Sequence, residues 1–302
     1  MARYNQFAAL VARVVLDFLL LIPLMVFWVS SLRSATHHAQ PTKLAQKFLK
    51  AAGPVFTLGV ILLVTAEIMS IVQRYTNTSS AYYLTFIYSG IYVSLTTSLF
   101  LTVGEILILA ALHVTTLAVL YVALGKAKAW RLLRIDVLVS VAILIIFAIA
   151  LFVKDVVMYS THANALTGQQ WLPLIINAIL LVLAVGIFAV AIYALSALKK
   201  RDARSLGNIP TLLLVASTLW LFHCTYSFAR NIQILFFPGG PVPDVRARPF
   251  LYTFLFLYPA AAVLALLTVI VRRPVWSGSV IGTKDQDEAT LRPSNENHAQ
   301  GF

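Results

Sequence analysis

Residues 84–124 read LTFIYSGIYVSLTTSLFLTVGEILILAALHVTTLAVLYVAL, an uninterrupted apolar run of 41 residues that contains one glutamate, Glu105, and one histidine, His113. At about 1.5 Å per residue this run would form roughly 60 Å of helix, about twice the ~30 Å hydrocarbon core of a bilayer. It is therefore either two crossings joined by a very tight turn, or one crossing with an extension outside the hydrocarbon. The sidedness of everything after it depends on that choice.

The composition indicates a polytopic membrane protein. Hydrophobic residues make up 60% of the chain and charged residues only 11%, which is unlike a soluble globular domain. The net charge is +12, but the basic residues lie in short clusters between apolar segments and form no single patch, so we expect no nucleic-acid partner. Cys224, which falls in an apolar segment, is the only cysteine in the sequence. An internal disulfide is therefore excluded.

Apolar segments divide the chain into a seven-helix transmembrane domain, 1–273, and a polar tail, 274–302, that we expect to be a disordered cytoplasmic segment. The first segment has the length of a retained helix and contains Arg13 and Asp17, which argues against a cleaved signal peptide. A basic loop is expected over 32–52. The expected helices are about 11–31, 53–72, 84–124, 135–157, 171–198, 209–235 and 250–271.

The distribution of lysine and arginine favours one crossing in the long run, because these residues are enriched in cytoplasmic loops. With seven helices, sixteen basic residues fall on one side and six on the other, and Arg13 lies within helix one. With two crossings in the run, the best division is fourteen to eight. The run has no proline and only Gly104 near its middle, and a turn there would leave backbone groups without partners in lipid.

We therefore predict an all-α bundle with its N-terminus outside and its C-terminus in the cytoplasm. The third helix would cross the bilayer from about Leu99 to Leu124, with a tyrosine-rich extension at the outer interface. The only N-glycosylation pattern, Asn77-Thr78-Ser79, then falls on the outer side. We expect the protein in the plasma membrane of a eukaryote.

Titratable side chains inside the expected helices are the candidate site residues, since they are costly in lipid and usually face the bundle interior or a wet cavity. On helix three, Ser98, Thr102, Glu105 and Thr116 form one polar stripe that His113 borders; on helix six, His223, Ser227 and Arg230 share a face. The candidate residues for ligand binding or helix pairing are Asp17, Glu67, Glu105, His113, His223 and Arg230.

Two interpretations of these charges remain open. They line an outward-opening polar pocket between helices one, two, three and six, or they hold the bundle together through an Arg13–Asp17 pair and through a pair of Arg230 with Glu105 or Glu67. A metal site of Glu105, His113 and His223 is disfavoured, because residues 105 and 113 are about 12 Å apart along a helix. No other motif in the sequence requires a metal or cofactor.

Helices six and seven carry a short similarity to a known family. Helix six reads Tyr226-Ser227-Phe228-Ala229-Arg230-Asn231-Ile232-Gln233, and helix seven begins Tyr252-Thr253-Phe254 and reaches Pro259. These segments resemble motifs of fungal seven-helix membrane proteins of the lipid-translocating exporter-like (RTA-like) kind. Gln233 and Leu255 stand where that family has acids. The resemblance implies interest in Arg230 and a link to lipids or toxic amphiphiles.

The sequence predicts a membrane protein that binds a small or amphiphilic ligand, with a receptor or sensor as the first hypothesis. Its partners would be the lipid bilayer and a cytoplasmic signalling protein that contacts the basic loops and the tail. An exporter or translocator of lipids or amphiphiles is the alternative, and an intramembrane enzyme is the third. The stripe on helix three stops near Thr116, about two turns before the inner end, which favours a closed pocket.

Overall fold

The computed structural model describes residues 2–33, 40–75, 82–124, 127–161, 171–200, 206–236, 247–273 and Trp276. Seven helices in these ranges are long and apolar enough to cross a membrane, and no strand occurs among the described residues. The predicted all-α, seven-helix fold is thus confirmed. The elements are α1 (Ala2–Arg33), α2 (Gln40–Tyr75), α3 (Tyr82–Leu124), α4 (Ala127–Thr161), α5 (Trp171–Lys200), α6 (Ile209–Phe236), α7 (Ala247–Tyr252), the π-helical turn η2 (Thr253–Leu257) and α8 (Tyr258–Val271).

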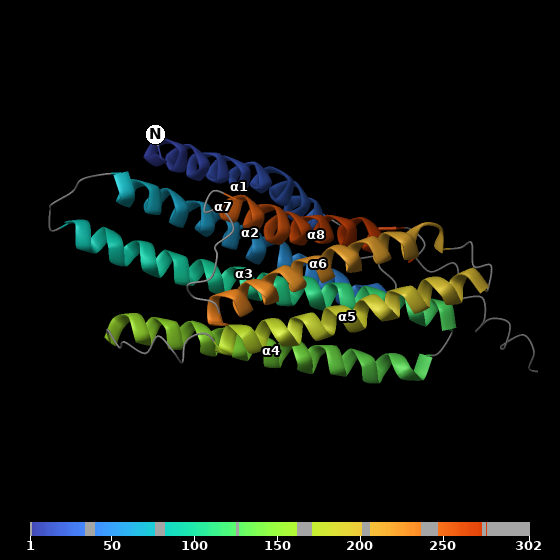
Figure 1. Ribbon diagram of the computed structural model, residues 1–302. Helices are drawn as coiled ribbons and strands as arrows, with labels where there is room; N and C mark the ends of the chain where they lie inside the picture. Colours follow the sequence, from blue (N-terminus) through green and yellow to red (C-terminus); the bar gives the residue numbers. More distant parts are fainter. Residues whose placement is uncertain are drawn as a thin grey trace, which may run out of the picture.

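Residues 84–124 lie in one unbroken helix, α3, at the centre of the bundle (Figure 1). In its most apolar stretch 83% of the residues are buried, against 17% for α1 and for α4. Three of its threonines are satisfied locally: the hydroxyls of Thr97, Thr115 and Thr116 donate to the carbonyls one turn earlier, at 2.7–2.8 Å. A hydroxyl satisfied in this way is tolerated inside an apolar helix.

The second helix begins at Gln40, well before the expected start at Gly53, so part of the basic loop predicted over 32–52 is helical. The reason lies in the pattern of its first three turns. Leu44, Ala45 and Leu49 are buried against the bundle, whereas Lys43 and Lys47 are exposed. This spacing is typical of an amphipathic helix. The prediction of a loop was wrong because it considered only the low hydropathy that the lysines give to this segment.

The seventh crossing is one continuous rod of α7, η2 and α8, although the helix type changes inside it. Pro259 has no N–H group, so the carbonyl four residues earlier cannot receive an α-helical hydrogen bond. The backbone widens just before the proline, where the N–H of Tyr258 donates to the carbonyl of Thr253. Such π-helical turns often accompany functional sites.

At the opposite end of the seventh crossing, one side-chain bond attaches it to α1 and another closes its own C-terminal end. The guanidinium of Arg272 donates to the carbonyl of Ser30 at the end of α1. Trp276 is buried, and its indole N–H donates to the carbonyl of Ile270 at 2.9 Å. The rest of the tail expected to be disordered, and the Asn77 glycosylation pattern, lie outside the described residues.

Helices α2 and α3 approach closely because each presents a glycine to the other. A Cβ on Gly104 would lie 3.0 Å from Cβ of Phe56, and one on Gly59 would lie 2.8 Å from a side-chain methyl of Leu101. Small residues at such positions allow membrane helices to pack backbone against backbone. The position of α3, and with it the stripe that carries Glu105, depends on this contact.

We predict that Gly104→Ala lowers the thermal stability of the detergent-solubilised protein by the equivalent of about 1–3 kcal/mol, because the added methyl overpacks the contact with Phe56. The matched control is Gly186→Ala on α5, where an added Cβ meets nothing within 4 Å. Thermal unfolding monitored by circular dichroism measures both. Equal stability of the two variants would contradict the proposed packing.

Candidate functional site

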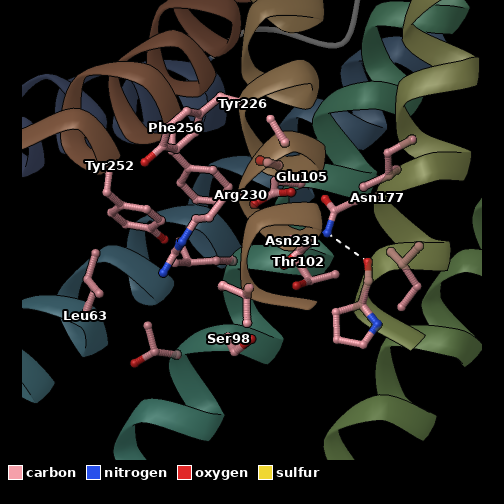
Figure 2. Close-up of a pocket in the computed structure, with 18 of the residues that line it drawn as sticks. Leu63, Ser98, Thr102, Glu105, Asn177, Tyr226, Arg230, Asn231, Tyr252 and Phe256 are labelled. Carbon is pink, nitrogen blue, oxygen red and sulfur yellow. Dashed lines mark hydrogen bonds between the residues drawn. The ribbon is translucent and has the colours of Figure 1, made fainter. Parts of the chain in front are cut away.

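A cavity of about 720 Å³ lies in the half of the bundle where α1 and α7 begin and where α2 and α6 end. Its size is within the usual range for small-molecule sites. Figure 2 shows how its side chains converge from several helices. The polar and charged lining residues are Arg13, Ser94, Thr97, Ser98, Thr102, Glu105, Asp155, Asn177, Tyr226, Ser227, Arg230, Asn231, Gln233 and Tyr252.

The cavity touches more helices than the sequence predicted. Helices one, two, three and six contribute to it as expected, but α4 contributes Asp155, α5 contributes Asn177 and α7 contributes Tyr252. These three elements form parts of the cavity wall that the sequence analysis did not predict. Leucine and isoleucine side chains from α2 to α6 also line the cavity, so its surface combines polar and apolar regions.

A cluster of charges behind the cavity wall joins the first, second and seventh crossings. Arg13 Nη2 lies 2.5 Å from Glu67 Oε1, and Arg13 Nε lies 3.6 Å from Asp17 Oδ2. The hydroxyl of Thr253 in η2 donates to Asp17 Oδ1 at 2.8 Å. Asp17 is fully buried, where an uncompensated carboxylate would be very costly. The predicted Arg13–Asp17 contact is therefore formed, and Glu67 shares the same guanidinium.

Glu105 lies at the base of the cavity and faces His223 on α6, with 3.5 Å between Glu105 Oε2 and His223 Nε2. His223 Nδ1 lies 2.9 Å from the carbonyl oxygen of Phe256 in η2. Since a carbonyl only accepts, Nδ1 carries a proton. The carboxylate of Glu105 and the imidazole of His223 therefore meet directly at the base of the cavity.

His223 is held in this orientation by aromatic rings on both sides. Its ring centroid lies 4.7 Å from that of Trp220, which is stacked on it, and 4.5 Å from that of Phe256. Trp220 and His223 are buried, whereas Phe256 is half-buried and lines the cavity. The base of the cavity is therefore a rigid, packed layer rather than an opening toward the other end.

Arg230 does not form the ion pair with Glu105 or Glu67 that the sequence suggested. Its guanidinium carbon lies 4.9 Å from the ring centroid of Tyr252, and no ion pair joins it to an acidic side chain of the described residues. The pairing prediction is wrong because Arg13 already compensates Glu67, and His223 already faces Glu105. Helical spacing indicates which residues share a face, but it does not determine which residue on another helix each will meet.

The other predicted site residues divide into two groups. Ser98, Thr102 and Glu105 of the helix-three stripe line the cavity, and so do Ser227 and Arg230 of the helix-six face. Thr116 and His113 do not line it: Thr116 is fully buried, and His113 is half-buried farther along α3. The three residues considered for a metal site therefore do not converge, since only Glu105 and His223 are in contact.

Two residues that matter for the cavity were not identified as site residues from the sequence. Asn177 is an amide inside an apolar helix, and that unusual placement is the signal that could have found it. Its Nδ2 donates to the carbonyl of Pro173 at 2.9 Å, as Figure 2 shows. Tyr252 belongs to the motif that resembles the exporter-like family, but a tyrosine near the end of a membrane helix is common and does not by itself indicate a site.

Comparisons with protein-family models, curated proteins and solved structures give no match for this chain. Function must therefore be argued from the geometry of the site. The cavity offers one guanidinium free of ion pairs within the described chain, a carboxylate in contact with a histidine, and several hydroxyls and amides. Such a set can orient a ligand through hydrogen bonds and charge.

We predict that Arg13→Gln destabilises the protein by about 3 kcal/mol, because it leaves two buried carboxylates without a cation. Adding Glu67→Gln to Arg13→Gln should restore much of the loss, since one of those charges is then removed. Thermal unfolding in detergent measures the series, with Arg273→Gln at the other end of the bundle as the control. A double variant as unstable as Arg13→Gln alone would show that the two side chains are not coupled.

Proposed function

We propose that this protein is a multi-pass membrane receptor or sensor that binds a small or amphiphilic ligand in the cavity. The observation that carries the proposal is a cavity lined by polar and apolar side chains in one half of the bundle, with packed apolar residues beneath it. Cavities between helices of a bundle are common ligand sites. The mixed lining suits a ligand with both a polar group and an apolar body.

The packing beneath the cavity favours a binding site over a transport path. Immediately after Glu105, α3 continues with buried Ile106, Ile108 and Leu112. On the facing helices, Trp220 and Leu257 are also fully buried. A translocator needs a polar path or groove that reaches the other side, whereas this interior is filled with close-packed apolar side chains. A receptor requires no such path.

The orientation is part of the proposal. The cavity lies in the half of the bundle that holds the start of α1, whereas the described basic residues Lys43, Lys47, Arg272 and Arg273 lie at the other end. By the excess of lysine and arginine in cytoplasmic loops, the cavity faces outside. A ligand would then arrive from the extracellular side, and the basic segments with the tail would contact a cytoplasmic signalling partner.

Contacts at the base of the cavity offer a route by which a ligand could change the helix arrangement. Glu105 lines the cavity and touches His223, and His223 also contacts the carbonyl of Phe256 in the π-helical turn. A ligand that displaces Glu105 from His223 would change the support of that turn. Helix shifts of this kind are a common means of transmitting a signal through a bundle.

The alternative function is export or translocation of lipids or amphiphilic compounds. The observation in its favour is the position of Arg230, which carries the resemblance to the exporter-like family and lines the cavity. The apolar side chains in the lining would contact the hydrocarbon part of such a substrate. An exporter would have to open the packed base during its cycle.

Transbilayer movement separates the two functions. We predict that proteoliposomes containing the protein move fluorescently labelled phosphatidylcholine between leaflets no faster than protein-free liposomes, as measured by dithionite quenching. A labelled amphiphile should instead bind saturably, and Thr102→Trp should weaken that binding because the indole occupies part of the cavity. Val139→Trp on the exposed face of α4 is the matched control.

The opposite result would support the exporter. If the wild type and Val139→Trp accelerate lipid movement and Thr102→Trp does not, the cavity is part of a transport path and the receptor proposal is wrong. Binding that is equal in wild type and Thr102→Trp would place the ligand site elsewhere.

A further inference from the structure

Two arginines lie over one tyrosine ring at the cavity, and only one of them is compensated. The guanidinium carbon of Arg13 is 5.2 Å from the centroid of the Tyr252 ring, and that of Arg230 is 4.9 Å from it. Arg13 contacts two carboxylates, Asp17 and Glu67. Arg230 forms no ion pair with any acidic side chain in the described part of the chain. The site thus presents one positive charge without a partner carboxylate.

The Tyr252 ring fixes where that charge lies. Figure 2 shows Arg230 extending from α6 to lie beside Tyr252, on the wall of the cavity. A guanidinium over an aromatic face is attracted by the ring, but the contact uses its π-face and leaves N–H groups at its edge free to donate. The guanidinium is therefore oriented without being neutralised.

A second donor lies one helical turn deeper on the same side of α6. Ser227 is only 7% exposed and lines the cavity, and its Oγ has no hydrogen-bond partner within the described residues. Three residues along a helix correspond to about 4.5 Å and to neighbouring positions on one face. A buried hydroxyl without a partner is costly, and a ligand oxygen in the cavity would satisfy it.

The other charged groups around the cavity do not compete for the same ligand atoms. Glu105 on α3 faces His223 on α6. Asp155 is on α4 and is next to Lys154 in the sequence. On α1, the charge of Arg13 is taken up by its own two carboxylates. Among the described groups, the Arg230 wall is where a negative charge gains most.

We infer that the cavity binds an anionic amphiphile, whose carboxylate or phosphate accepts hydrogen bonds from Arg230 and Ser227. This inference rests on the proposed function in one respect, that the cavity is the ligand site. A guanidinium matches the oxygens of a carboxylate or phosphate in a bidentate geometry. The hydrocarbon part of the ligand lies against the leucine and isoleucine side chains of the lining.

The test uses the full chain in non-ionic detergent with three probes of equal chain length: decanoate, decyl phosphate and decylammonium. The midpoint of thermal unfolding is followed as each probe is added. Decanoate or decyl phosphate should raise the midpoint, and decylammonium should raise it less. Removing a charge-assisted hydrogen bond corresponds to a change in Kd of about 10-fold to 100-fold, so Arg230→Gln should weaken the anionic probes by that factor.

Further variants separate the assigned roles. Arg230→Lys should retain part of the affinity, since an ammonium keeps the charge but loses the planar fork. Ser227→Ala should weaken the anionic probes less than Arg230→Gln. Arg273→Gln, which removes an arginine outside the cavity, should leave the affinity for all probes unchanged. This control separates binding at Arg230 from a general effect of net charge.

The outcomes are distinct. An equal response to anionic and cationic probes, no response to any probe, or anionic binding that Arg230→Gln leaves intact would overturn the inference. A preference for decyl phosphate would indicate a lipid headgroup, and a preference for decanoate a free carboxylate; both support the anion site. Thr102→Trp separates this inference from the proposed function. If decylammonium is the only probe that binds and Thr102→Trp weakens its binding, the cavity is still the ligand site, and only the assignment of an anionic ligand is wrong.

Discussion

Compensation of buried charge is the constraint on which this bundle depends. An ionised side chain in the membrane interior is costly unless it meets an opposite charge or a hydrogen-bond donor. Asp17 is fully buried, and it is compensated by Arg13 on its own helix and by Thr253 on the seventh crossing. Glu67 brings the second helix to the same guanidinium. Three crossings that are distant in the sequence are therefore held together at one end of the bundle.

The polar residues of the chain fall into two classes with different consequences. Hydroxyls such as Thr115 and Thr116 donate to the carbonyl one turn earlier and need nothing from other helices. Carboxylates, guanidiniums and imidazoles need another polar or charged side chain: Asp17 meets Arg13 on its own helix and Thr253 on another, and Glu105 meets His223. Arg230 is the exception, because its contact is the ring of Tyr252. The guanidinium of Arg230 therefore has no partner carboxylate among the described residues.

The fold was largely predictable because the bilayer reduces the choices available to the chain. Apolar segments of this length form helices, and the absence of a proline or a suitable turn made residues 84–124 one crossing. The early start of α2 was not predicted, because Lys43 and Lys47 lower the mean hydropathy of this segment to that of a loop. Leu44 and Leu49 are buried on the opposite face, so the helical spacing of apolar residues would have indicated a helix.

The sequence by itself determined the seven-helix class and the faces that carry Glu105, Ser227 and Arg230, since these follow from segment length and a fixed helical period. Apart from Arg13 and Asp17, which are one turn apart on the same helix, only the tertiary structure decided which charged groups meet. Glu105 faces His223 and not Arg230, and Arg230 lies over Tyr252. The reason is that such pairings depend on how neighbouring helices are rotated and shifted, and close contacts such as Gly104 against Phe56 set those positions across the bundle.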